Sequence, residues 1–171
     1  MENISTAIRL ALQMEHKGYD LYIKAAQTTL NRLGRATLEA IAKKELDHIK
    51  AIEEFSKGMD LKQAAADIKP QDQSLYLREI MDKLAGNLEK QVKPDSDLER
   101  VYKVALDLEK ASFELYKKLN AESSDPQAKK FFEFLMGEEN THYEILSDTL
   151  EYLNDPGEWY RLQERWIVEG G

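Results

Sequence analysis

Cysteine is absent from all 171 residues of the chain. Its absence excludes disulfide bonds, thiolate catalysis and cysteine-held iron, whether in clusters or in single-iron sites. Any redox chemistry of this protein must therefore use oxygen and nitrogen ligands.

Glycine and proline are also scarce, with 8 and 4 residues. Alanine, leucine, glutamate and lysine, which favour helices, dominate instead. A chain of this length can bury one sizeable core. The composition therefore predicts an all-α fold with one main domain.

Long apolar runs and basic clusters are missing as well. No segment approaches the roughly 18 apolar residues needed to span a bilayer, and the first 20 residues carry charge throughout, unlike a signal peptide. The net charge is −8, and no Lys/Arg cluster is interleaved with aromatic residues. We expect a cytoplasmic protein with neither a membrane nor a nucleic acid as partner.

Histidine is rare, yet two of the three histidines belong to a doubled pattern. Two Glu-x-x-His pairs each follow a lone glutamate by 30 residues, and these six residues are Glu15, Glu45, His48, Glu109, Glu139 and His142. Residues three apart on a helix share a face, so each pair can direct a carboxylate and an imidazole at one point. The pattern predicts a site for two metal ions.

The repeat extends beyond these residues, because residues 11–55 align without a gap on residues 105–149, with nine identities. In each half the midpoint between the lone glutamate and the histidine falls on turn signals, at Asn31–Gly34 and at Ser124–Pro126. Residues on antiparallel helices lie level only when the turn is midway between them. Each half is therefore predicted to be a helical hairpin with its ligands near mid-bundle.

Helical periodicity places the four helices at residues 3–29, 35–57, 97–122 and 127–153. The connection over residues 58–96 can run the length of a bundle, as a four-helix fold with one long crossover requires. We expect a bundle over residues 1–154 and a C-terminal arm over residues 155–171. The arm holds Trp159 and Trp166, which should pack on the bundle or on a second subunit.

Four glutamates and two neutral imidazoles carry four negative charges, which two divalent cations would balance. Iron and manganese both accept these ligands. We expect Glu45 and Glu139 to bridge the ions, and Glu15 and Glu109 to be terminal ligands. The third histidine, His16, has no counterpart in the repeat and is expected in solvent.

Two tyrosines, Tyr22 and Tyr116, follow the lone glutamates by seven residues and so lie on the ligand face. Each could donate a hydrogen bond to a ligating carboxylate of the other hairpin. The alternative is a plain helix contact with the hydroxyl at the surface.

The segments MEHKGYDLY, KKELDHIK, LEKASFELY and GEENTHYEI resemble those of the ferritin-like superfamily, and within it the rubrerythrin branch, from residue 3 to about residue 153. The resemblance implies a ferritin-like four-helix bundle with a di-iron centre that reacts with hydrogen peroxide or dioxygen, as in protection against oxidative stress.

Two features depart from that family. The chain has no cysteine for a rubredoxin domain, so electrons would come from an external donor protein. Rubrerythrins also carry an extra glutamate one turn after the third-helix ligand, where this chain has Ser112, with Gly18 at the matching position of the repeat. We expect the space beside Ser112 and Gly18 to admit water or a small oxidant.

Three functions are compatible with the sequence. The leading hypothesis is a rubrerythrin-like oxidoreductase that reduces peroxide or dioxygen and forms a homodimer. The second is iron oxidation and storage of ferritin type, which needs a large closed oligomer. The third is a metal-free interaction protein.

Overall fold

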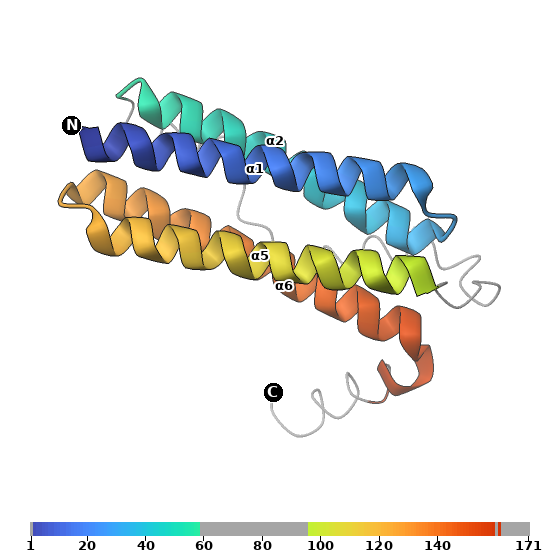
Figure 1. Cartoon of the computed structure of the whole chain (residues 1–171). Coiled ribbons are helices and arrows are strands. Elements are labelled where there is room, and N and C mark those ends of the chain that lie inside the picture. Colours follow the sequence, from blue (N-terminus) through green and yellow to red (C-terminus); the bar gives the residue numbers. More distant parts are fainter. Residues whose placement is uncertain (1, 59–95, 160, 162–171) are drawn as a thin grey trace.

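A computed structural model describes residues 2–58, 96–159 and 161 of the chain (Figure 1). This part holds four long helices and no strand: α1 (Glu2–Thr28), α2 (Arg32–Ser56), α5 (Ser96–Glu122) and α6 (Pro126–Asn154). The all-α prediction is confirmed. Most of the predicted crossover and the end of the arm, including Trp166, lie outside the described residues.

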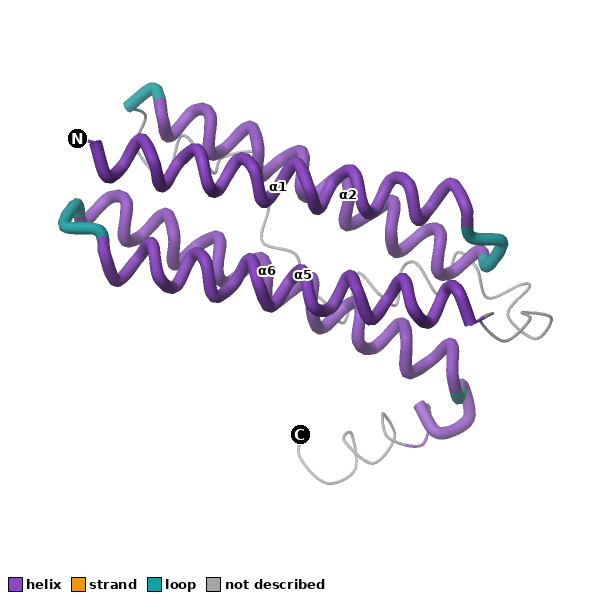
Figure 2. The backbone as a smooth tube through the Cα atoms, viewed as in Figure 1, coloured by secondary structure: helices purple, strands orange, loops and turns teal. Residues whose placement is uncertain are grey.

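The helices form two hairpins, α1 with α2 and α5 with α6, that pack side by side with their turns at opposite ends of the bundle (Figure 2). Across the junction α1 contacts α5 and α2 contacts α6. This arrangement brings the two halves of the sequence repeat face to face. None of the described helices is long and apolar enough to cross a membrane.

The helix ends follow local capping chemistry. Asn31 caps α2 by accepting a hydrogen bond from the backbone N–H of Gly34 at 2.9 Å, and Asp125 caps α6 just before Pro126. Because Asn31 caps so effectively, α2 begins at Arg32, three residues earlier than predicted. At the other end of α2, Gly58 adopts a φ of 85°, the left-handed conformation that favours glycine.

Gly34 therefore lies inside the first turn of α2 and not in the loop. A Cβ atom at this position would come within 3.1 Å of the Leu98 side chain. The carbonyl oxygen of Gly34 accepts a hydrogen bond from the buried hydroxyl of Tyr102. Glycine here allows α5 to approach α2 closely.

Two apolar clusters fill the bundle on either side of its middle. One lies toward the α1–α2 turn and includes Leu33, Leu38, Tyr102, Leu146 and Tyr152. The other lies toward the α5–α6 turn and includes Ile8, Ile52, Phe131, Phe132 and Leu135. The polar residues of the repeat occupy the layer between them.

The start of the C-terminal arm contacts the bundle. Trp159 packs edge-on against Tyr152, with ring centroids 5.5 Å apart, and extends the first apolar cluster. This contact favours packing on the bundle over packing on a second subunit for the first of the two tryptophans.

Candidate metal centre

All six residues of the doubled pattern converge in the middle of the bundle, and each is at most 3% exposed. Each helix contributes its own part. The six are Glu15 from α1, Glu45 and His48 from α2, Glu109 from α5, and Glu139 and His142 from α6. Burying this many ionisable groups without a compensating partner would be costly, so the cluster calls for a chemical explanation.

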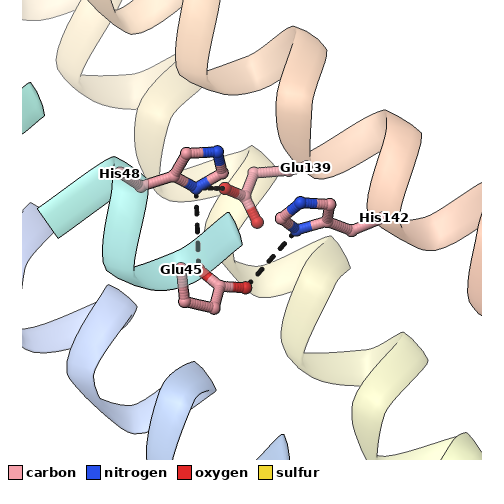
Figure 3. A group of neighbouring side chains, drawn as sticks. All are labelled: Glu45, His48, Glu139 and His142. Carbon is pink, nitrogen blue, oxygen red and sulfur yellow. Dashed lines mark ion pairs between the residues drawn. The ribbon is translucent and has the colours of Figure 1, made fainter. Parts of the chain in front are cut away.

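Four of these side chains form the centre of the cluster, namely Glu45, His48, Glu139 and His142 (Figure 3). Each offers one ligand atom, and these atoms all lie within 4.8 Å of one another. The two imidazole rings are nearly parallel, with centroids 5.1 Å apart. Carboxylate oxygens and imidazole nitrogens at this spacing suit iron or manganese.

The two remaining glutamates lie beside one histidine each. Oε2 of Glu15 is 3.1 Å from Nδ1 of His48, and Oε2 of Glu109 is 3.5 Å from Nδ1 of His142. Glu45, in contrast, reaches both histidines, His48 at 3.6 Å and His142 at 3.4 Å, with a different oxygen for each. These contacts suit Glu45 as a bridge and Glu15 and Glu109 as terminal ligands.

Two tyrosines join the hairpins at this level. Tyr22 of α1 donates a hydrogen bond to Glu109, and Tyr116 of α5 donates one to Glu15. Both tyrosines are fully buried, so the alternative with the hydroxyls at the surface is wrong. Burial and the neighbouring carboxylates raise the pKa of both hydroxyls well above 10, which keeps them protonated as donors.

Burial and neighbouring charges shift the pKa values of the glutamates at this centre in opposite directions. Burial and the nearby charge of Glu15 raise the pKa of Glu45 to about 8. Burial and the same charge raise the pKa of Glu139 well above its usual value. Burial acts in the same sense on Glu15, but hydrogen bonding to Glu45 and the charge of His48 outweigh it and hold its pKa at about 2.

The pKa values of both histidines are raised by the glutamates beside them, Glu15 for His48 and Glu109 for His142. Burial alone would lower the pKa of His142, but Glu109 raises it to about 9. The pKa of His48 is likewise well above 6.5, against the effect of burial, mainly because of Glu15. The raised pKa values of both histidines favour imidazolium ions beside Glu15 and Glu109, and the raised pKa values of Glu45 and Glu139 favour protonated carboxyl groups.

Buried polar atoms without a hydrogen-bond partner indicate whether this site fits metal ions. At this centre, four buried atoms have no hydrogen-bond partner among the described residues: Oε2 of Glu109, Oε1 of Glu139 and both ring nitrogens of His142. Buried polar atoms normally have partners. Carboxylate oxygens and imidazole nitrogens that face one another without hydrogen bonds are the donor set that a carboxylate-bridged pair of cations would need, so the residues fit the predicted group.

Other sequence predictions have mixed outcomes. His16 is exposed, as expected. Ser112 is buried at 5% exposure. The prediction that the space beside Gly18 admits water or a small oxidant is wrong, because a Cβ atom there would lie 3.2 Å from Cδ of Glu45. The Glu45 carboxylate fills the volume that the missing side chain leaves.

Sequence reasoning missed Glu138, the neighbour of Glu139. Its Oε2 lies 3.5 Å from Nε2 of His48 and 4.0 Å from Nζ of Lys44. A signal was available, since the residue matching Glu138 in the other half of the repeat is Lys44, a reversal of charge beside an otherwise preserved ligand.

Comparisons with known proteins agree with this geometry. The family model described as rubrerythrin matches residues 7–150, which include all four described helices in whole or in large part and all six buried residues of the centre. No curated protein and no solved structure matches the chain. The match covers most of the sequence, and the helical bundle is that of the ferritin-like fold. This chain belongs to the rubrerythrin family.

Proposed function

We propose that this protein is a di-iron oxidoreductase that reduces hydrogen peroxide or dioxygen with electrons from a separate donor protein. The observation that supports it most strongly is the convergence of four buried glutamates and two buried histidines, one set from each hairpin. Membership of the rubrerythrin family supports the same assignment.

The six proposed ligands form three pairs. Glu15 and His48 would hold one ion, Glu109 and His142 the other, and Glu45 and Glu139 would bridge them. Two bound Fe(II) ions would supply the two electrons that reduction of one peroxide requires. Manganese accepts the same ligands and is the alternative metal.

The protein's own residues would shape the site in three ways. The apolar clusters on both sides limit the access of water. Tyr22 and Tyr116 hold Glu109 and Glu15 in place through hydrogen bonds to their carboxylates. The helices keep all six ligands on rigid elements, so that little rearrangement accompanies a change of charge at the centre.

We expect an external electron donor, because these 171 residues include no cysteine that could hold a second iron site. We expect the working assembly to be a homodimer in the cytoplasm, where reducing proteins are available. Its mass by size-exclusion chromatography separates this proposal from ferritin-type storage, which would require a cage.

Anaerobic reconstitution with Fe(II) tests the proposal. Two iron ions per chain should bind, and peroxide and dioxygen, added separately, should each be tested for oxidation of the iron and for turnover with a chemical reductant. The His48→Ala variant should lose iron and turnover, while the matched variant His16→Ala should keep both. Iron uptake far beyond two ions per chain would favour storage, and no iron binding would favour an interaction protein.

A further inference from the structure

The two histidines of the centre differ in what surrounds Nε2, the ring nitrogen that points away from the six-residue cluster. Nδ1 of His48 faces Glu15 at 3.1 Å and Glu139 at 3.6 Å, while its Nε2 faces Glu138 at 3.5 Å. The ring of His48 therefore has carboxylates at both nitrogens. Nε2 of His142 has no hydrogen-bond partner among the residues that the structure describes, 2–58, 96–159 and 161.

The sequence explains this difference. The two halves of the repeat place His48 opposite His142 and Lys44 opposite Glu138. A pseudo-twofold arrangement would therefore bring Lys44 to the position near His142 that Glu138 occupies near His48. A lysine ammonium has only donors, so it cannot accept a hydrogen bond from an imidazole N–H.

Glu138 is well placed to act on His48. Its side chain is only 15% exposed, and Lys44 lies 4.0 Å from the same carboxylate oxygen that faces the ring. A carboxylate that accepts a hydrogen bond from Nε2–H of a ligating histidine fixes the tautomer, leaves the Nδ1 lone pair for the metal and makes the ring a stronger ligand.

We propose that Glu138 is a positioning residue for His48, and that it makes the two metal positions unequal. The position formed by Glu15 and His48 binds metal more tightly than the position formed by Glu109 and His142. This inference rests on the proposed metal centre and adds an order of filling to it.

The test is a titration of the full-length protein with Co(II), followed by optical absorption and calorimetry. Wild type should bind two ions with distinct affinities. Glu138→Ala should weaken the tighter position by about 10- to 100-fold and leave the other unchanged. Glu138→Gln should retain more affinity than Glu138→Ala, since its amide oxygen can still accept a hydrogen bond from Nε2–H. Glu133→Ala, at an exposed position of the same helix, is the matched control.

A double-mutant cycle shows whether the effect passes through His48. Adding Glu138→Ala to His142→Ala should weaken the remaining position, while adding it to His48→Ala should have no further effect. Equal loss at both positions, or the same loss without His48, would overturn the inference. If wild type binds no Co(II), the proposed function fails first; if it binds two ions and Glu138→Ala changes neither, only this inference fails.

Nitrogen-15 NMR of the Zn(II)-loaded protein measures the protonation and hydrogen bonding of the histidine ring nitrogens. These signals would not change if Glu138 only stabilised the fold. His48 should carry its proton on Nε2, with a signal typical of a strong hydrogen bond that is lost in Glu138→Ala. If that variant does not fold, as judged by its helical circular dichroism, Glu138→Gln decides. Its neutral amide oxygen accepts a weaker hydrogen bond than a carboxylate does, so the signal should move toward that of a weak hydrogen bond, and a signal identical to that of wild type contradicts the proposal.

Discussion

Tyr116 donates a hydrogen bond from its hydroxyl to the carboxylate of Glu15 across the junction between the two hairpins. Tyr22 makes the matching hydrogen bond to Glu109. Each tyrosine thus ties its own hairpin to the glutamate of the other, so the assembly of the bundle and the geometry of the site depend on the same two contacts.

Tyr116→Phe should therefore lower both the stability of the protein and its affinity for metal. Hydrogen bonds to charged groups contribute about 1.5–3 kcal/mol, which should appear as a loss in urea unfolding of the metal-free protein. Tyr102→Phe is the matched control, because its buried hydroxyl donates to the Gly34 backbone and lies away from the centre. That variant should lose stability and keep its metal affinity. Unchanged metal affinity in Tyr116→Phe would contradict the role of Tyr116.

Single substitutions of the histidines should distinguish the proposed ligands, His48 and His142, from His16. His48→Ala and His142→Ala should each reduce metal content, measured by elemental analysis after Fe(II) loading and gel filtration. His16→Ala should retain full content, because its side chain is exposed. Equal losses in all three variants would refute the assignment of the centre.

Metal binding should release protons near neutral pH, since ligands must be deprotonated to bind metal. The number released depends on the four groups whose pKa values are raised, namely His48, His142, Glu45 and Glu139. Calorimetry of Co(II) binding in buffers of different ionisation enthalpy measures this number. Release of no protons would mean that the four groups do not carry protons in the metal-free site.

The metal-free protein should become less stable as pH rises from mild acidity. Glu45 has a pKa of about 8 when folded, against 4.5 ordinarily, so its contribution is complete below about 4.5 and is lost as pH rises through 8. The contribution of His142 is likewise complete below 6.5 and is lost as pH rises through about 9. Glu15 acts in the opposite sense, because its lowered pKa contributes above 4.5 and the contribution is lost toward pH 2.

The melting temperature of the metal-free protein should therefore be higher near about pH 5.5 than near about pH 8.5. Metal should reverse this trend, since its ligands bind better when deprotonated. Thermal unfolding followed by circular dichroism, with and without a chelator, makes the comparison. A metal-free melting temperature that rises across this range would contradict the protonation pattern of the site.

Gly18→Ala should weaken metal binding without weakening the helix. The added Cβ would lie 3.2 Å from Cδ of Glu45 and restrict the movement that this carboxylate needs to reach two ions. Alanine itself favours a helix interior over glycine by about 1 kcal/mol. Gly137→Ala is the control, because a Cβ there would have no described atom within 4 Å, and it should stabilise the protein with no change in Co(II) affinity. Equal Co(II) affinity in both variants would exclude a role for the Gly18 site.

The sequence by itself determined the helices, the hairpin repeat and the set of six candidate ligands. The reason is that these features are local or periodic. A Glu-x-x-His pair shares a helix face whatever surrounds it. Likewise, Asn31, Pro126 and Gly58 determine where the adjacent helices begin or end.

Tertiary structure alone decided which groups meet across helices. Three contacts depend on how α2 is rotated against its neighbours. Glu138 lies beside Nε2 of His48, the Glu45 carboxylate lies next to Gly18, and Gly34 lies close to the Leu98 side chain. The proton distribution also arises there, because a pKa depends on burial and on charges a few ångströms away. Periodicity specifies a helix face, but contacts between faces are fixed only when the bundle packs.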